Sequence, residues 1–227
     1  MYRDDLAYIH HVGFSEFSQS AAPWIVALLK RHDVTTVVEL GCGSGVLARE
    51  LTRAGFDVHG FDASPSMIAL ARETAPGARF AAGAFDEVSL PPCDAMIAMG
   101  EVLNYGTLEG VRKLIAQVPA RLLLFDVAER GAYPPYDEHR SGGDDWSVIA
   151  IKESDGIHLR RRVLTFRADG RRDEEVHTLE LYDRAGLTAL LRAHGFRTTI
   201  RRSYGTRRLP TGHAVYVAVR LLLLARP

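Results

Sequence analysis

The chain has 227 residues, of which 47% are hydrophobic and 25% charged, the usual mix for a folded globular protein of one or two domains. This composition excludes an intrinsically disordered chain. The 28 basic and 28 acidic residues cancel, so no net charge favours nucleic acid or an anionic membrane. Cys42 and Cys93 are too few for a disulfide scaffold or a thiolate cluster, and we expect no metal.

The two ends of the chain show no targeting or membrane pattern. The first residues lack the basic and then apolar segments of a signal peptide. The longest apolar run, Ala214–Ala225, is interrupted by Arg220 and is shorter than the ~20 residues of a membrane span. We therefore expect a cytoplasmic protein with no membrane partner.

Strands and helices alternate through the first 129 residues. The pattern begins with a helix over Ser20–Arg31, with Ser20 as a possible N-cap, and a β-branched strand over Val34–Leu40. The next predicted elements are a helix over Val46–Ala54, a strand over Asp57–Phe61, a helix over Ser64–Glu73, strands over Arg79–Ala81 and Asp94–Met99, a helix over Leu108–Gln117 and a strand over Arg121–Val127. This alternation predicts right-handed βαβ units around a parallel sheet.

The pattern changes after Glu129. A Pro/Gly-rich loop is followed by three segments of two-residue period, Trp146–Glu153, Ile157–Phe166 and Arg171–Leu181. Their connections both contain Asp-Gly, which predicts hairpins and an inserted antiparallel meander. A helix over Asp183–His194, with Gly195 after its end, and strands over Phe196–Tyr204 and Ala214–Leu222 complete a single α/β domain.

The most informative stretch is Val37–Gly45, VVELGCGSG, where a strand runs into a glycine-rich turn and then a helix. Asp62 follows the next strand, where its carboxylate can accept hydrogen bonds from ribose hydroxyls. Val46 occupies the position where a dinucleotide fingerprint needs glycine or alanine, which disfavours an NAD oxidoreductase. Glu39, two residues before the first glycine, suits a cationic amino-acid group better than a pyrophosphate.

These residues resemble the class I S-adenosylmethionine-dependent methyltransferases, in particular small bacterial members of unassigned substrate. VVELGCGSG is similar to their first motif and VHGFDASPSMI (Val58–Ile68) to their second. The resemblance continues through Ala81–Tyr105, Arg121–Glu129 and Glu174–Tyr182.

The resemblance implies a Rossmann-like α/β fold. Its seven-stranded mixed sheet would be mostly parallel, with the last strand antiparallel, helices on both faces and the meander as an insertion. Residues 1–33 would form an N-terminal lid and first helix, 34–129 the cofactor-binding core, 130–182 a substrate cap, and 183–227 the C-terminal helix and last two strands. The protein is expected to be a monomer or a homodimer.

The resemblance also implies S-adenosyl-L-methionine as cofactor and S-adenosyl-L-homocysteine as product. Glu39 would hold the methionine moiety and Asp62 the ribose. The full set of expected cofactor-binding residues is Glu39, Gly41, Cys42, Gly43, Gly45, Asp62, Ala63, Met67, Gly83, Ala84, Phe85 and Glu101. Ala84 stands where the third motif often has an acidic residue, which leaves adenine recognition to backbone groups and ring packing.

Three segments carry the candidate catalytic and acceptor-binding residues. His177 is the candidate base, and regular alternation places it on one strand face with Glu175, although a histidine there is often a core residue. Glu101 and Tyr105 are further catalytic candidates, the alternative for Tyr105 being packing. The substrate-binding candidates are Tyr8, His11, Asn104, Trp146 and Glu175, with a turn cap as the alternative for Asn104 and an anchor for Trp146.

These observations predict a methyltransferase acting on O or N of a small-molecule acceptor. The 13 arginines and six acids between residues 160 and 208 leave an RNA methyltransferase as an alternative. We favour solvated, salt-bridged strand faces instead, because alternation separates Arg160 and Arg162 from Arg161 and acidic residues lie nearby. A non-catalytic cofactor-binding module is the other alternative.

Overall fold

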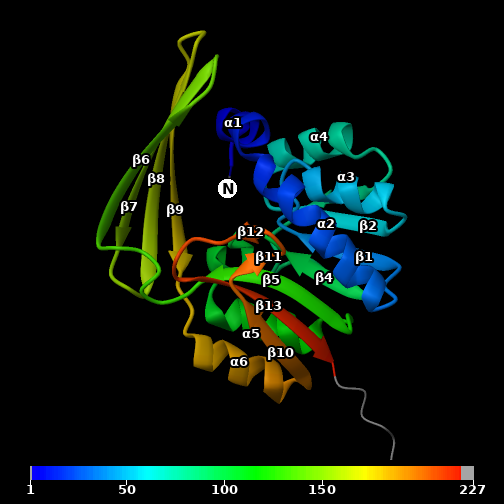
Figure 1. The fold of residues 1–227 in the computed structure, drawn as a ribbon. Coiled ribbons are helices and arrows are strands. Elements are labelled where there is room, and N and C mark those ends of the chain that lie inside the picture. The colour runs from blue at the N-terminus through cyan, green and yellow to red at the C-terminus, as the bar shows by residue number, and fades with distance from the viewer. Residues whose placement is uncertain (1, 221–227) are drawn as a thin grey trace, which may run out of the picture.

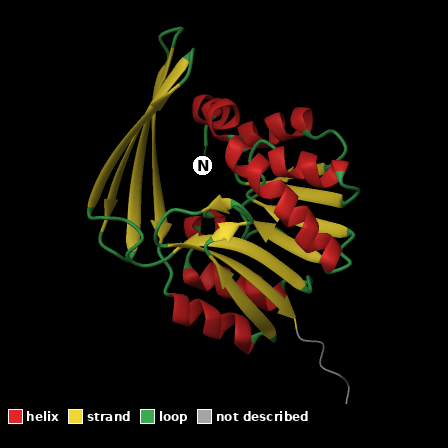
Figure 2. Cartoon of the chain, in the orientation of Figure 1, coloured by secondary structure: helices red, strands yellow, loops and turns green. Residues whose placement is uncertain are grey.

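The computed structural model describes residues 2–220 and, within them, two sheets and a short two-stranded ribbon (Figure 1 and Figure 2). The helices are α1 (Asp4–Phe14), α2 (Glu16–Arg31), α3 (Val46–Arg53), α4 (Pro65–Thr74), the 3₁₀ turn η1 (Val102–Tyr105), α5 (Leu108–Gln117) and α6 (Arg184–Ala193). The strands are β1 (Thr36–Leu40), β2 (Asp57–Asp62), β3 (Arg79–Ala82), β4 (Ala95–Ala98), β5 (Leu122–Ala128), β6 (Tyr136–Gly142), β7 (Trp146–Ser154), β8 (His158–Arg167), β9 (Arg172–Glu180), β10 (Phe196–Arg201), β11 (Ser203–Tyr204), β12 (Arg207–Arg208) and β13 (His213–Arg220).

The main sheet has seven strands in the order β10-β13-β5-β4-β1-β2-β3. Strands β1 to β5 pair in parallel, and β13 is antiparallel to both of its neighbours. This confirms the predicted mixed sheet with an antiparallel last strand. The carboxyl ends of β1, β2 and β4 therefore meet at one edge of the sheet, where ligands bind in open α/β folds.

Two layers of helices bury the two faces of this sheet (Figure 1). Alternation sends Val37 of β1 to the face covered by α2 and α3, and Val38 to the face covered by α5 and α6. Both faces are apolar because both are covered, which explains the nearly continuous apolar sequence of the central strands.

Strands β6 to β9 form an antiparallel meander that stands beside the main sheet, with α1 between them (Figure 2). Gly156 and Gly170, with φ of +88° and +90°, turn the two predicted Asp-Gly hairpins. Leu6 of α1 packs against Val148 and Val163 on the inner face of the meander. The first helix of the chain thus joins the meander to the core.

Three element predictions were wrong in detail. Ser20 lies inside α2, which begins at Glu16, and its hydroxyl donates to the Phe17 carbonyl rather than capping the helix. The Pro/Gly-rich loop contains strand β6, so the meander has four strands instead of three. The strand predicted over Phe196–Tyr204 ends at Arg201, and the chain then turns into β11.

The last predicted strand, Ala214–Leu222, corresponds to β13 up to Arg220. Its final two residues lie outside the described part of the chain.

Candidate functional site

The turn from β1 to α3 is shaped by three glycines in the left-handed region. Gly41, Gly43 and Gly45 have φ of +63°, +52° and +77°, which L side chains rarely adopt. A Cβ on Gly41 would lie 2.3 Å from Val102 Cγ2, whereas one on Gly43 would meet nothing within 4 Å. The turn therefore packs closely against η1 at its start and leaves open space over Gly43.

Asp62 braces this turn from the end of β2. Its carboxylate accepts hydrogen bonds from the backbone N–H of Gly43 at 2.9 Å and of Ser64 at 2.8 Å. Burial raises the pKa of Asp62, and these two backbone hydrogen bonds partly offset that effect. Each oxygen keeps a lone pair beyond its backbone bond, so the carboxylate can also accept from ligand hydroxyls.

Glu39 is a buried carboxyl group that lacks a full set of partners. The residue is 4% exposed, and Oε2 has no hydrogen-bond partner within the described residues. Burial, followed by the nearby Asp62 charge, raises the pKa of Glu39 to about 8. A cationic group at this point would satisfy the orphaned oxygen and restore the charged form. The ammonium of an amino-acid moiety fits that requirement.

The predicted adenine-side residues follow β2 and β3. The Ser64 hydroxyl caps α4 by accepting from the N–H of Met67 at 3.2 Å, and Gly83 N–H donates to the Asp62 carbonyl at 2.9 Å. Ala63 and Ala84 lie in these two connections. Phe85 packs into the main core against Gly106. A Cβ added to Gly106 would lie 2.3 Å from the Phe85 ring. Its ring is therefore committed to packing.

Cys42 is buried in the glycine turn, and burial raises the pKa of its thiol well above the usual range. Its backbone N–H donates to the Phe61 carbonyl at 3.0 Å. Cys42 thus contributes backbone and packing to the turn, and its thiol stays protonated.

The turn after β4 is held in an unusual backbone conformation. Gly100 has φ of +92° and Glu101, a non-glycine residue, has φ of +61°. The buried Asp126 of β5 accepts from both backbone N–H groups, at 2.8 Å and 3.1 Å, and from Tyr204 Oη at 2.6 Å. Asp126 thus fixes the direction in which the Glu101 side chain leaves the turn.

Glu101 lies at the centre of a buried polar cluster. Its Oε1 accepts from Tyr133 Oη at 2.8 Å and His213 Nε2 at 2.7 Å, and its Oε2 pairs with Arg161 at 2.8 Å. Burial alone would raise the pKa of Glu101, but Arg161 and His213 outweigh it and hold this pKa well below its usual range. The other nitrogen of His213 faces the Thr211 carbonyl at 3.2 Å. Both ring nitrogens therefore donate, and Glu101 raises the pKa of His213 against the effect of burial.

The sequence did not identify Arg161, Tyr133 or His213 as site residues. They come from β8, the loop after β5, and β13, and only the fold brings them to Glu101. The available signal was the alternation that separates Arg161 from Arg160 and Arg162.

His177 and Glu175 share the inner face of β9, as strand alternation indicates. Both are buried, and His177 Nε2 lies 3.4 Å from Glu175 Oε2, yet neither atom has a hydrogen-bond partner within the described residues. Burial lowers the pKa of His177 to about 4, so its ring is neutral at pH 7. The rings of Tyr2 and Tyr105 lie 5.2 Å and 5.8 Å from the His177 ring.

Helix α1 connects the glycine turn with the meander. His11 Nδ1 lies 2.9 Å from Ser44 Oγ in the turn, and Tyr8 Oη donates to Asp145 at 3.1 Å on the meander. The backbone N–H of Arg3 donates to Glu175 Oε1 at 2.8 Å. Trp146 packs directly over Gly13, where a Cβ would lie 2.4 Å from its indole ring. Tyr8 and Trp146 are thus engaged in holding α1 on the meander.

Asn104 is part of the supporting frame of the site. Its side-chain NH₂ donates to the carbonyls of Ala128 and Glu180 at 3.0 Å and 2.6 Å, and its carbonyl accepts from Ala128 N–H at 2.9 Å. The amide is fully buried and joins η1 to β5 and β9. Tyr105 remains 38% exposed beside it.

The arginine pairs on the outer meander face have acidic partners. Arg160 pairs with Glu153 at 3.0 Å and Arg162 with Glu174 at 3.7 Å. Within residues 2–220, the side chains form no group of three or more His, Cys, Asp or Glu that could hold a metal ion. None of the helices in that range combines the length and apolar character needed to cross a bilayer.

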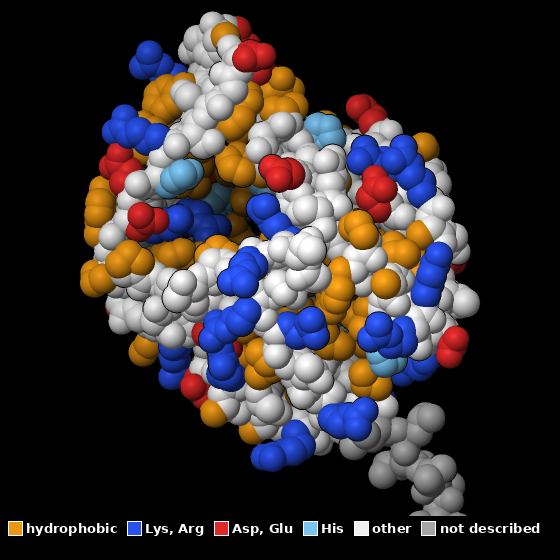
Figure 3. Space-filling model, viewed as in Figure 1, with side chains coloured by type: hydrophobic (Ala, Val, Ile, Leu, Met, Phe, Trp, Pro, Cys, Tyr) orange, Lys and Arg blue, Asp and Glu red, His pale blue; other side chains and the backbone are white. Residues whose placement is uncertain are grey.

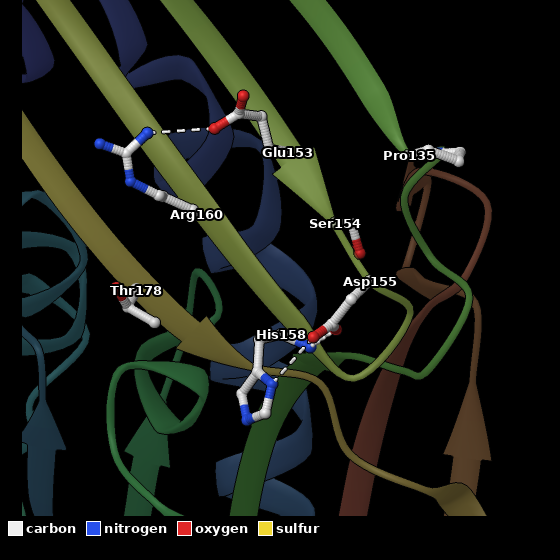
Figure 4. Close-up of a pocket in the computed structure, with 7 residues that line it drawn as sticks. All are labelled: Pro135, Glu153, Ser154, Asp155, His158, Arg160 and Thr178. Carbon is white, nitrogen blue, oxygen red and sulfur yellow. Dashed lines mark hydrogen bonds and ion pairs between the residues drawn. The ribbon is translucent and has the colours of Figure 1, made fainter.

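An open pocket of about 390 Å³ lies at the base of the meander, on its outer face (Figure 4). Its lining residues are Pro135, Glu153, Ser154, Asp155, His158, Arg160 and Thr178. Arg160 and Thr178 face each other across β8 and β9 on the side opposite His177, so this pocket is separate from the cluster around Glu101 and His177. The hollow that concerns the site is the one between the meander and the core, where basic and histidine side chains are visible (Figure 3).

Comparisons with known proteins agree with this geometry. Residues 37–123 match the family described as a methyltransferase domain. A malonyl-[acyl-carrier protein] O-methyltransferase of Pectobacterium atrosepticum is 32% identical over 84 residues, which cover 37% of this chain and 32% of that protein.

Solved structures share the fold over nearly the whole chain. An S-adenosylmethionine-dependent methyltransferase from Clostridium acetobutylicum has a TM-score of 0.80 at 14% identity, covering 94% of this chain and 97% of its own. The sugar N-methyltransferase KedS8 from Streptoalloteichus has a TM-score of 0.77 at 17% identity, with coverages of 97% and 94%. CalS10, a SAM-bound amino pentose methyltransferase from Micromonospora echinaspora, has a TM-score of 0.71 at 22% identity, with coverages of 97% and 98%.

The domain match covers the glycine turn, Asp62 and the strands that position them, and the shared fold extends from this core through the meander. Residues 37–123 therefore form a methyltransferase domain, and the chain as a whole has the fold of solved S-adenosylmethionine-dependent methyltransferases.

Proposed function

We propose that the protein transfers the methyl group of S-adenosyl-L-methionine to a nitrogen or oxygen of a small polar acceptor. The observation that carries the proposal is the buried Glu39 carboxyl, whose Oε2 has no hydrogen-bond partner among residues 2–220 and which lies near Asp62, the residue that holds Gly43 N–H. A buried acceptor atom without a donor is costly unless a ligand supplies one. The methionine ammonium supplies a charged donor for it.

The donor residues take distinct roles in this proposal. Glu39 binds the ammonium, Asp62 accepts from the ribose hydroxyls, and the backbone around Gly83 and Ala84 contacts the adenine. Met67 packs beside it from α4. The bound cofactor supplies a methyl group already activated by a sulfonium, so the protein has mainly to hold the acceptor in line with it.

The acceptor would bind in the hollow between the core and the inner face of the meander (Figure 3). Residues 130–182 act as a substrate cap, and residues 1–33 act as a lid, in which His11 of α1 contacts Ser44 and Arg3, just before α1, contacts Glu175. His177 is neutral at pH 7, and its Nε2 has no hydrogen-bond partner in the described part of the chain, so it can accept the proton that the acceptor loses.

A nitrogen acceptor is favoured over oxygen. KedS8 is a sugar N-methyltransferase and CalS10 an amino pentose methyltransferase, and both share the fold through the meander. The carboxyl of Glu175 and the rings of Tyr2 and Tyr105 surround His177 with groups that attract an amine. The preferred acceptor is therefore an amino group on a small, sugar-like molecule.

The first test is isothermal titration of S-adenosyl-L-homocysteine into the protein, with NADH as the control ligand. The product is used because it cannot turn over. Micromolar binding of S-adenosyl-L-homocysteine alone supports the donor site. Binding of NADH in its place would contradict the proposal.

The second test addresses His177. His177→Asn should lower kcat on any acceptor found in a methyl-transfer screen and leave the affinity for S-adenosyl-L-homocysteine unchanged. His158→Asn, on the exposed outer end of β8, is the matched control and should change neither quantity. An unchanged kcat for His177→Asn would remove His177 from the mechanism.

A further inference from the structure

The run Arg160-Arg161-Arg162 in β8 is divided by strand alternation into two different environments. Arg160 and Arg162 face outward, and about half of the Arg160 side chain (52%) is exposed beside Glu153. Arg161 faces inward and is only 16% exposed. The Arg162 side chain is 40% exposed beside Glu174, although its Nε is buried. The much deeper burial of Arg161 needs a specific explanation, because a guanidinium is rarely buried without partners.

The hydrogen bonds of Arg161 leave part of its guanidinium unused. Its Nη2 donates to Glu101 Oε2 at 2.8 Å and Tyr133 Oη at 3.2 Å, and its Nη1 reaches Tyr105 Oη only at 3.4 Å. Its Nε is buried and has no partner within the described residues. The Glu101 carboxylate neutralises the charge of Arg161, while the Nε–H donor remains available.

The residue opposite Arg161 in the β8–β9 ladder is His177. Directly paired residues have Cα atoms about 5 Å apart, so the two side chains are neighbours on the inner face. His177 Nε2 and Glu175 Oε2 are also buried, and neither has a hydrogen-bond partner among residues 2–220. One small area of the meander therefore presents an unpaired donor, an unpaired carboxylate oxygen and an unpaired imidazole nitrogen.

We infer that Arg161 is an acceptor-binding residue and that the acceptor is an amine with a hydroxyl group on the neighbouring carbon. The inference rests on the proposed function and specifies its acceptor. The amine lies at Glu175 and His177, and the hydroxyl oxygen accepts from Arg161 Nε. A hydroxyl fits better than a carboxylate, because Glu101 already neutralises Arg161 and the Glu175 carboxyl would repel a second anion.

A matched pair of probes tests this arrangement. We would titrate trans-2-aminocyclohexanol and cyclohexylamine, which differ in one hydroxyl, into the protein saturated with S-adenosyl-L-homocysteine and follow binding by ligand-observed NMR. A site that hydrogen-bonds a substrate hydroxyl rejects the analogue that lacks it. The wild-type protein should bind the amino alcohol about tenfold more tightly, as expected for a hydrogen bond from a charged donor.

Three variants separate Arg161 from its neighbours. Arg161→Met should abolish the preference for the amino alcohol. Arg161→Lys keeps a cation beside Glu101 and so preserves the buried ion pair. This variant should also lose the preference for the amino alcohol, because it lacks the Nε–H donor. Arg160→Met, one residue away on the outer face, should retain the wild-type preference.

The outcomes distinguish this inference from the proposed function, because S-adenosyl-L-homocysteine binding is measured on every variant. Normal product binding, with equal or no binding of the two probes by wild type, would overturn the inference alone. A preference that survives in Arg161→Lys would also overturn it. Failure of wild type to bind S-adenosyl-L-homocysteine would instead count against the donor site.

Discussion

The donor edge of the main sheet and the inner face of the meander are built in different ways. The donor edge is mostly backbone, formed by Gly41, Gly43 and Gly45 at positive φ and by N–H groups that Asp62 holds in place. The inner face of the meander is mostly side chain, with Arg161, Glu175 and His177 among its buried polar groups.

This difference separates what is common to a fold from what is specific to one protein. A backbone cradle binds the same cofactor whatever surrounds it, because glycines and N–H groups depend only on the local turn. A surface of side chains changes with each substitution. We expect changes at the donor edge to alter cofactor affinity and changes on the meander to alter the choice of acceptor.

The largest expected effect is on stability, at the joint between the two regions, by which we mean the Asn104 hydrogen bonds from η1 to β5 and β9. Asn104→Ala removes three buried hydrogen bonds that connect η1 with β5 and β9, and the Ala128 carbonyl then keeps only its longer bond from Tyr182 N–H, at 3.3 Å. The free energy of unfolding should fall by about 3 kcal/mol, since each of the three buried hydrogen bonds contributes about 1 kcal/mol. Urea denaturation followed by circular dichroism measures it.

The control for the joint is Tyr105→Phe, the neighbouring and partly exposed residue, which should change the free energy of unfolding by less than about 0.5 kcal/mol. A loss below about 1 kcal/mol in Asn104→Ala would show that the joint is held by packing rather than by these hydrogen bonds.

Asp62→Ala tests the donor edge directly. The variant loses the anchor of Gly43 N–H and the acceptor proposed for the ribose hydroxyls. Affinity for S-adenosyl-L-homocysteine should weaken by about 1–3 kcal/mol, the range for hydrogen bonds to a charged group. Asp57→Ala, at the exposed start of the same strand, is the control. Its affinity for S-adenosyl-L-homocysteine, measured by titration calorimetry, should equal that of wild type. Equal affinities for Asp62→Ala and wild type would remove Asp62 from the site.

Glu39 should make cofactor affinity depend on pH. Its pKa of about 8 means that the carboxyl is mostly protonated at pH 7, and only the charged form attracts the ammonium. Affinity for S-adenosyl-L-homocysteine should therefore rise several-fold between pH 7 and pH 8, because Glu39 loses its proton over that interval. In Glu39→Gln the affinity should be lower and this rise absent, whereas the exposed Glu73→Gln should behave like wild type.

The same raised pKa affects the ligand-free protein in the opposite direction. The folded state keeps its proton on Glu39 up to about pH 8, whereas the unfolded state loses it near the ordinary value of 4.5. Stability must then fall as pH rises between these values, because the unfolded state binds fewer protons there. Thermal unfolding of Glu39→Gln should show a weaker fall than wild type.

The contrast between the two regions also explains what the sequence could predict. The strand-turn-helix around Gly41–Gly45 and the hairpins at Gly156 and Gly170 are local, since each depends on a few adjacent residues with special backbone conformations. Strand β6 was missed because its charged, mostly exposed residues show no two-residue apolar period and pair only with β7. Alternation placed His177 and Glu175 on one face, a local property of a strand.

The cluster around Glu101 depends on long-range contacts. Glu101 meets Arg161 across 60 residues and His213 across 112 residues of chain. No local pattern marks such a pair, because each residue is an ordinary polar residue in its own segment. The structural role of Asn104 could not be predicted for the same reason. Its side chain supports the site only because β5 and β9 meet at η1 in the fold.

The smallest expected effect concerns Tyr204, which lies under the turn that aims Glu101 toward the meander. Its hydroxyl donates to Asp126, and Asp126 accepts from the N–H groups of Gly100 and Glu101. Tyr204→Phe should lower the free energy of unfolding by about 1 kcal/mol, the net value of one hydrogen bond. It should also lower kcat/KM for the acceptor more than the affinity for S-adenosyl-L-homocysteine, because Asp126 holds the Glu101 turn that aligns Arg161, whereas Gly43 is held by Asp62. Equal losses in both quantities would mean that Asp126 supports the donor edge and the acceptor side alike.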